Sequence, residues 1–277
     1  MVRELRTCPV TGRIVLLNQT WPDPLPQVPT VPAPCWFCEP GRGPVLARVG
    51  VWRAVPHPVP ALGIEGDVRV RAEGGRVRRD AVGAHELLFT EQHPARPKAA
   101  IHADASRLLI SRVHDLRRDT RLRSFRMIHR AAPGLHPVWQ LFALPFDLAT
   151  TAPAAWRDGE LRDRERVVAE TETVVVIAAW APRQPFELWV LPRRGRKRLE
   201  ELDISELFTE AALWAERTSD ALRGAAVDWV VEDGEPVRIE LIPRVSPPSA
   251  VEVGAGLPLH GVRPEEAATF LRSRLAT

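Results

Sequence analysis

Short apolar runs separated by glycine and proline are the feature that most limits what this chain can fold into. Runs such as VWRAV (51–55), HELLF (85–89) and VRIELIPR (237–244) have the length and composition of strands. Fewer segments have the spacing of an amphipathic helix, among them 106–123 and 205–222. Strands therefore outnumber helices and many are expected to pair antiparallel, which predicts the α+β class.

A proline-rich segment, WPDPLPQVPTVPAP at 21–34, excludes a helix or a central strand there, because proline lacks a backbone N–H and fixes φ. It leads to Cys35 and Cys38, a Cys-x-x-Cys pair that offers two thiolates on a tight turn. The pair is typical of half a zinc site or of a redox centre. A redox Cys-x-x-Cys pair is expected between a strand and a helix, whereas prolines flank this pair.

A zinc site needs two more ligands, for which histidines are the obvious source. Spacing alone does not select among them. The candidates are His57, His85, His93, His102, His114, His129, His136 and His260.

The bulk composition narrows the classes of partner. Of 277 residues, 45% are hydrophobic and 26% are charged, and the formal charge is only +3, so we expect no nucleic-acid partner. No apolar run approaches the roughly 20 residues of a membrane helix, and the N-terminus lacks the apolar core of a signal peptide. We therefore predict no membrane association and a cytoplasmic location. Three cysteines do not make a disulfide framework.

Several stretches follow one another in a recognisable order over most of the chain. They are CPVTGRIVLL, CWFC, VPALGIEG, GAHELLFTEQHP, HPVWQLFALPF, VVAETETVVVIAAWAPRQPFELWVLP, VRIELIPR and VEVGAGLPLHGVRPEEAATFL. The ordered set resembles the galactose-1-phosphate uridylyltransferase family, a branch of the histidine-triad superfamily. The resemblance implies two fused histidine-triad-like halves, mainly antiparallel sheet flanked by helices. We place them at 1–155 and 156–277, expect one integrated unit, and expect a homodimer.

The resemblance also implies a ligand set for zinc. The family positions correspond to Cys35, Cys38, His93 in FTEQH, and His136. A closed Cys₂His₂ set leaves no open position for water or substrate, so we expect this zinc to be structural.

The family's nucleophile is the second histidine of a His-Pro-His-x-Gln motif, which attacks the α-phosphorus of a nucleotide sugar through a neutral ring nitrogen. Here the motif reads His136-Pro137-Val138-Trp139-Gln140. Val138 cannot form the nucleotidyl-imidazole intermediate, so the family's ping-pong mechanism is excluded at that position. Gln140, which by resemblance holds a phosphate oxygen, is retained.

Other departures from the family pattern agree with this loss. FRMIHRAAPGLHP (125–137) and PHPVPAL (56–62) lack the asparagines that hold the nucleotide. NQTWPDP (18–24) lacks the basic pair expected after the first strand, and EVGAGLP (252–258) lacks the acidic residue of galactose-specific members. Together these losses indicate that the original reaction has gone.

Three functions are left open. The favoured one is an enzyme repurposed for specialised metabolism, with a pocket lined by Val138, Trp139 and His57 that takes a small molecule, a nucleotide or phosphate ester among the candidates. The second is a nucleotidyltransferase whose nucleophile has moved, with His129 as the candidate because it lies in the phosphate-side loop. The third is a non-catalytic ligand-binding protein. Further candidate anion contacts are Arg183, Arg244, Pro248 and Ser249.

Overall fold

The computed structural model describes most of the chain. The described residues are 3–7, 14–18, 36–38, 43–90, 99–130, 136–147, 154–194, 199, 204–234, 237–259 and 261–274.

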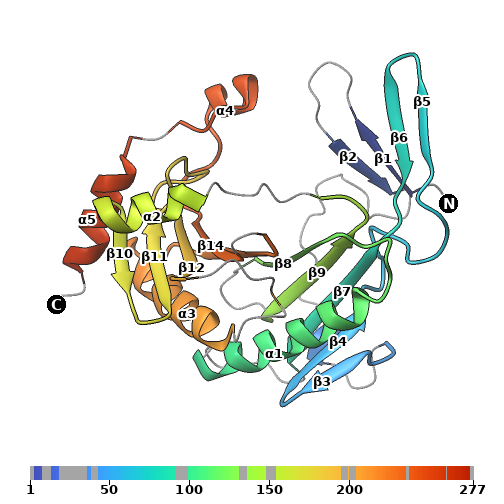
Figure 1. Ribbon diagram of the computed structural model, residues 1–277, viewed down its shortest axis with the longest axis horizontal. Helices are drawn as coiled ribbons and strands as arrows, with labels where there is room; N and C mark the ends of the chain where they lie inside the picture. Colours follow the sequence, from blue (N-terminus) through green and yellow to red (C-terminus); the bar gives the residue numbers. More distant parts are fainter. Residues whose placement is uncertain are drawn as a thin grey trace, which may run out of the picture.

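A ten-stranded sheet runs through the whole molecule (Figure 1). All pairings between its neighbouring strands are antiparallel. In spatial order the strands are β10 (Val167–Glu170), β11 (Val174–Ala178), β12 (Leu188–Pro192), β14 (Arg238–Pro243), β13 (Val227–Glu232), β8 (Ser124–His129), β9 (Val138–Leu144), β7 (Ala84–Thr90), β4 (Trp52–Pro56) and β3 (Ala47–Val49).

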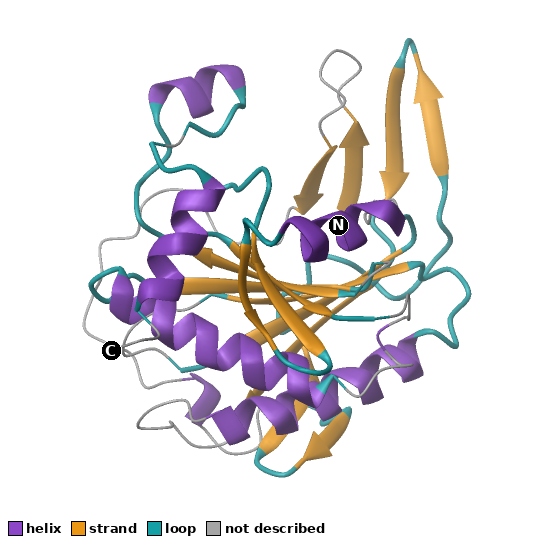
Figure 2. Ribbon diagram, turned by 60° about the vertical axis from the view of Figure 1, so that its left-hand side comes forward, coloured by secondary structure: helices purple, strands orange, loops and turns teal. Residues whose placement is uncertain are grey.

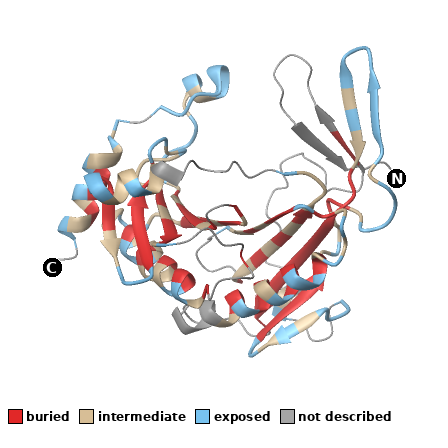
Figure 3. Cartoon of the chain, in the orientation of Figure 1, coloured by how far each residue is buried: buried red, intermediate tan, exposed pale blue. Residues whose placement is uncertain are grey.

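A second, four-stranded sheet projects from one end of the first (Figure 1). Its strands are, in spatial order, β2 (Ile14–Asn18), β1 (Arg3–Thr7), β6 (Arg76–Asp80) and β5 (Val70–Glu73). The tip of its β5–β6 hairpin is exposed to solvent (Figure 3). At the base of this sheet, Leu5 on β1 packs with Leu62 and Ala81.

Two long helices cover one face of the large sheet (Figure 2). They are α1 (Ala99–Leu116) and α3 (Ser205–Ala221), and they also contact each other. Their apolar side chains form the main core with inward-facing strand residues. The remaining elements are η1 (Trp36–Cys38), α2 (Ala154–Asp163), α4 (Ala250–Ala255) and α5 (Pro264–Ser273). Among the described residues, no helix is long and apolar enough to cross a membrane.

Strand β9 shows how the sheet separates core from site. Trp139 and Leu141 are fully buried in the core beneath the helices, while Val138, Gln140 and Phe142 are half-buried on the other face. This separation follows from the two-residue alternation of a strand. We call the face that carries Val138, Gln140 and Phe142 the site face.

The structure confirms the predicted α+β class with mainly antiparallel sheet. It also confirms strands in the runs at 51–55, 85–89 and 237–244 and the helix at 205–222. The helix predicted at 106–123 instead spans Ala99–Leu116, because Arg117–Thr120 turn out of it ahead of β8. Strand, helix, strand, strand occurs twice, as β7-α1-β8-β9 and β12-α3-β13-β14. The boundary near residue 155 stays a prediction.

Candidate functional site

The side chain at the position of the family's nucleophile lies in a cluster of apolar side chains. Val138 packs with Val55, Leu87 and Phe89 on the site face, together with Phe37 from η1. The rings of Phe37 and Phe89 meet edge to face with centroids 5.1 Å apart. The valine thus belongs to a small hydrophobic cluster.

Gln140, two residues further along the same face, is held by a histidine. Its Oε1 lies 3.0 Å from Nε2 of His85 on the neighbouring strand β7. The other ring nitrogen of His85, Nδ1, lies 3.1 Å from the backbone N of Ala61. Because a backbone N–H can only donate, Nδ1 is the acceptor, and the proton of the neutral ring is on Nε2. His85 therefore donates to Gln140.

Two aromatic rings enclose His85. His57 stacks on one side with centroids 4.1 Å apart, and Phe142 stacks on the other at 4.2 Å. Burial, followed by the nearby His57, lowers the pKa of His85 to about 4, although the hydrogen bond to Gln140 acts in the opposite direction. Burial also lowers the pKa of His57. His85 is therefore neutral at physiological pH.

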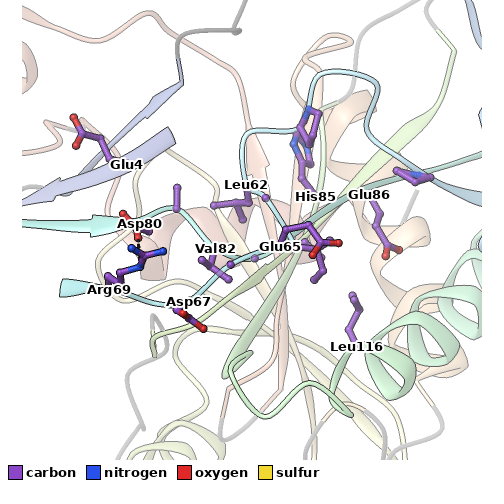
Figure 4. A pocket seen from close by; sticks show the side chains of 18 of the residues that line it. Glu4, Leu62, Glu65, Asp67, Arg69, Asp80, Val82, His85, Glu86 and Leu116 are labelled. Carbon is purple, nitrogen blue, oxygen red and sulfur yellow. Dashed lines mark ion pairs between the residues drawn. The ribbon is translucent and has the colours of Figure 1, made fainter. Parts of the chain in front are cut away.

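A pocket of about 910 Å³ opens beside His85, between the end of β7 and the four-stranded sheet (Figure 4). Its floor includes apolar side chains such as Leu62, Val82 and Leu116. One wall carries Glu86, whose two carboxylate oxygens accept hydrogen bonds of 2.7 and 2.8 Å from the buried guanidinium of Arg112.

The opposite wall of the pocket carries a second ion-pair group. Arg69 and Arg71 both approach Asp80, at 3.6 and 3.2 Å. Glu65 and Asp67 lie on the exposed loop between the walls (Figure 4). The pocket thus combines an apolar floor with charged walls. Gln140 is not among its lining residues, but His85, to which Gln140 is hydrogen-bonded, is one of them.

Two of the four expected metal ligands lie together next to this site. Cys38 Sγ is 3.6 Å from His136 Nδ1. His136 Nε2 is 2.8 Å from the carbonyl oxygen of Thr90, which can only accept, so Nε2 carries the proton and Nδ1 presents its lone pair to the sulfur side. Cys35 and His93, the other two expected ligands, lie outside the described residues.

The structure places two of the other candidates on the face of the sheet opposite to the Val138 side chain. Trp139 lies on the core face, where its ring contacts Phe208 and Trp229. His129 ends strand β8 instead of lying in a loop, and its register opposite Trp139 puts it on the core face too. His57 lies on the site side of the fold, stacked on His85.

Two of the candidate anion contacts have other partners. The guanidinium of Arg183 donates to Glu187 at 2.8 Å and to Glu240 at 2.5 Å. Ser249 caps α4, because its hydroxyl accepts a hydrogen bond from the backbone N of Glu252. His85 was only one of eight candidate histidines in the sequence. Its two-residue spacing from Leu87 on a strand was the available signal for the site face.

Comparisons with known proteins agree on the fold. No protein-family model matches the sequence, and no curated protein sequence matches it. A structure of a uridylyltransferase superposes with a TM-score of 0.74 at 18% identity, covering 99% of this chain and 98% of that one. An ADP-glucose phosphorylase from Arabidopsis thaliana with bound ADP-glucose gives 0.68 at 19%, covering 98% of each chain.

A galactose-1-phosphate-uridylyltransferase-like protein, also from Arabidopsis thaliana, superposes with a TM-score of 0.69 at 19% identity. That match covers 97% of this chain and 98% of the other. These likenesses extend over almost the whole of each chain. The fold implied by the sequence motifs, that of the uridylyltransferases, is therefore confirmed.

Proposed function

We propose that this chain is a divergent galactose-1-phosphate uridylyltransferase-like protein that binds a phosphate-bearing small molecule without forming a nucleotidyl-histidine. In this proposal it is a cytoplasmic enzyme of specialised metabolism. The observation that carries the proposal is the position of Val138, on the site face beside Gln140 and within an apolar cluster. The fold and Gln140 support a nucleotide or phosphate ester as ligand, and Val138 removes the covalent step.

No other histidine among the described residues takes over the attack on phosphorus, which needs a ring nitrogen with an accessible lone pair. The Nδ1 atoms of His57 and His85 accept hydrogen bonds from Val59 and Ala61, which leaves each neutral ring protonated on Nε2. His136 directs its Nδ1 at Cys38.

His129, the candidate for a nucleophile that has moved, is also poorly placed to attack a ligand on the site face. Its Nδ1 donates to the carbonyl oxygen of Val138 at 2.9 Å, and its ring packs against Trp139 at 4.7 Å on the core face. His114 is exposed on α1, on the far side of the sheet. These placements favour a protein whose reaction, if it uses a nucleotide, has no covalent histidine intermediate.

The ligand would extend from Gln140 into the pocket. A phosphate oxygen at the amide of Gln140 would leave the remainder of the ligand next to His85, which lines the pocket. A cavity of about 910 Å³ is within the range of small-molecule sites. Its apolar floor fits a base or another uncharged group better than a second phosphate.

Intact mass spectrometry tests the loss of the covalent step. Wild type and Val138→His are incubated with UDP-glucose or ADP-glucose, and His129→Ala serves as the control for a moved nucleophile. We expect no nucleotidyl adduct on wild type and an adduct on Val138→His, which would show that the nucleotide site is intact without its attacking group. An adduct on wild type would overturn the proposal, and its loss in His129→Ala would identify the nucleophile.

Equilibrium binding tests the ligand class. Isothermal titration of wild type with UDP-glucose, ADP-glucose and inorganic phosphate is compared with titration of Gln140→Ala. We expect at least one of the phosphate-bearing probes to bind and the Gln140→Ala variant to bind it several-fold more weakly. No binding of any of these probes to wild type would overturn the proposed ligand class. Binding without turnover of any bound probe would favour the non-catalytic alternative.

We further propose that Cys35, Cys38, His93 and His136 hold a structural zinc ion. With zinc–sulfur and zinc–nitrogen distances of about 2.3 and 2.0–2.1 Å, a tetrahedral angle separates the two ligand atoms by about 3.6 Å. Cys38 Sγ and His136 Nδ1 are 3.6 Å apart. The hydrogen bond from His136 to Thr90 supplies the outer contact that typically orients a metal-bound histidine. The pair therefore fits zinc.

Metal analysis tests the zinc site. We expect about one zinc per chain in wild type and in Cys8→Ser, the matched control, and much less in Cys35→Ser and Cys38→Ser. Zinc retained in both ligand variants, or absent from wild type purified without chelator, would contradict the site.

We also propose that the chain is a homodimer that uses α4. This helix has a complete capping box at Ser249 and Glu252, yet none of its residues is buried. Val253 on the helix is 77% exposed and Leu257 just after it 64%. A formed helix with an uncovered apolar side fits a protein interface. Sedimentation should give a dimer for wild type and for the exposed control Val51→Asp, and a monomer for Val253→Asp/Leu257→Asp. A wild-type monomer would contradict this.

A further inference from the structure

We propose that His85 is a positioning residue that fixes the side-chain amide of Gln140 so that its N–H groups face the ligand. This position then selects a hydrogen-bond acceptor, such as an ionised phosphate, sulfate or carboxylate oxygen, and rejects a group that can only donate, such as an ammonium. The inference rests on the proposed function and deepens it, since it assigns the polarity of the ligand group at Gln140.

The direction of each hydrogen bond is fixed from the backbone outwards. The N–H of Ala61 donates to Nδ1 of His85, so the ring proton is on Nε2 and donates to Oε1 of Gln140. A glutamine amide offers one acceptor oxygen and one NH₂ group on the same carbon. With its oxygen directed at His85, Gln140 turns the NH₂ group away from that ring.

The ring of His85 has little freedom to break this arrangement. It is 3% exposed and lies between His57 and Phe142 in near-parallel stacks of 16° and 21°. His57 is itself held by the backbone N–H of Val59, 3.1 Å from its Nδ1. The pKa of His85, lowered to about 4, keeps its ring neutral over the physiological range. The Nε2–H of His85 therefore stays the donor and its Nδ1 the acceptor.

The energetic role is preorganisation. Without a donor at His85, the two orientations of the Gln140 amide become similar in energy, and the ligand must select the one with its NH₂ outward. A hydrogen bond to a charged ligand group is stronger than one to a neutral group, and part of its contribution to affinity depends on that orientation. We expect a loss of about tenfold in affinity for an acceptor ligand when the donor is removed, which equals about 1.4 kcal/mol.

Three variants separate hydrogen bonding from packing. His85→Phe keeps an aromatic ring between His57 and Phe142 but removes the donor. His85→Gln can donate to Gln140 from its amide nitrogen and is the rescue variant. His114→Gln, on the exposed side of α1, is the matched control.

The probes are UDP-glucose and ADP-glucose, compared with uridine and adenosine, which lack phosphate. We expect His85→Phe to bind the nucleotide sugars about tenfold more weakly and the nucleosides with little change, and His85→Gln to recover most of the loss. Equal losses for both kinds of probe, or no rescue by His85→Gln, would show a merely structural role for His85.

The outcomes also distinguish the inference from the proposed function. If the probes bind wild type and Gln140→Ala weakens them but His85→Phe does not, the inference is wrong and the proposed function stands. If Gln140→Ala has no effect on a bound probe, or no probe binds wild type, the proposed contact at Gln140 is wrong and the positioning role with it.

Nuclear magnetic resonance supplies a readout that needs no ligand. In protein labelled with ¹⁵N at histidine, we expect His85 at neutral pH to carry its proton on Nε2 and none on Nδ1. A proton on Nδ1, or a doubly protonated ring at neutral pH, would overturn the inference whatever the binding results.

Discussion

Strands β9 and β14 occupy equivalent places in the two strand–helix–strand–strand units, yet the faces they present differ. Each is the last strand of its unit, and each buries two side chains beneath a helix, Trp139 and Leu141 on β9 and Ile239 and Leu241 on β14. On the opposite face β9 carries Val138 and Gln140. The corresponding residues of β14 are both charged, Arg238 and Glu240.

The charges on β14 are paired with charges from neighbouring segments. Arg238 bonds Glu240 at 2.7 Å and also pairs with Glu232 on β13. Arg126 on β8 pairs with Glu232 as well, and Arg183 bonds Glu240. Because these carboxylates are buried and each has an arginine partner, the charges on this face of β14 are paired within the protein, with Arg126 of the first unit taking part. The first unit instead has an uncharged glutamine there, half-buried and hydrogen-bonded to His85, which lines the pocket. Equivalent positions in one fold thus hold an open site and a closed ion-pair network.

Breaking the network should have the largest effect on stability. Glu232 is 3% exposed at its side chain and has both Arg126 and Arg238 as partners. Glu232→Ala leaves two guanidinium groups without this carboxylate, and removing one partner of a buried pair costs about 3–5 kcal/mol. Gln140→Ala removes one hydrogen bond of His85 and should cost about 1 kcal/mol. Urea unfolding measures both, with the exposed Glu216→Ala on α3 as control. A smaller loss for Glu232→Ala than for Gln140→Ala would reverse the comparison.

Lowering the pH should destabilise the unit that contains His85 before it disrupts the ion-pair network at β14. Burial lowers the pKa of His85 to about 4, whereas the unfolded chain has a histidine pKa of about 6.5. The unfolded state therefore binds more protons between these values, and stability that is full above pH 6.5 falls as the pH drops toward 4. Burial lowers the pKa values of His57 and His129 in the same direction.

Wild type should be less stable at pH 5 than at pH 7 by an amount on the order of 1–2 kcal/mol from His85 alone. His85→Phe should show a smaller difference between the two pH values, and its remaining slope should come from the other two histidines. Urea unfolding at both pH values checks this. Equal slopes in the two proteins would mean that His85 titrates alike in the folded and unfolded chain.

The sequence predicted most of the framework because local patterns specify it. The strand runs around Leu87 and Leu241 and the helix at 205–222 have the expected periodicity, and the ordered motifs implied the fold. The open site was harder. Alternation along β9 placed Trp139 and Val138 on different faces but did not say which faced the core; packing against Phe208 and Trp229 decides it.

His85 and the ion-pair network depend on contacts between strands that are distant in sequence. The hydrogen bond from His85 to Gln140 joins residues 55 positions apart, and the pair of Arg126 and Glu232 joins residues 106 apart. No local pattern marks such partners. His129, predicted to lie in a loop, belongs to a strand for the same reason. Its pairing with Trp229 and Trp139 extends β8 to include it.

The smallest predicted effect on stability concerns the loop of residues 63–67, which lines the pocket. Arg121 donates to the carbonyl oxygens of Ile64 and Gly66, and Asp119 holds its guanidinium in place. Arg121→Ala should lower stability by only about 1 kcal/mol, because the lost hydrogen bonds lie at the surface. It should nevertheless speed amide hydrogen exchange in residues 63–67, the loop that lines the pocket, without changing exchange in β13 and β14.

The matched control is Arg118→Ala, whose side chain is 74% exposed and pairs only with Asp115 in the described part of the chain. Hydrogen exchange by mass spectrometry should leave its 63–67 loop as in wild type. If Arg121→Ala also leaves amide exchange in this loop unchanged, apolar packing at Leu62 and Val82 holds the loop in place. The two strand–helix–strand–strand units would then differ in side-chain charge alone. If exchange rises there and nowhere else, the loop beside the pocket depends on a surface arginine, whereas the network at β14 depends on arginines paired with buried carboxylates.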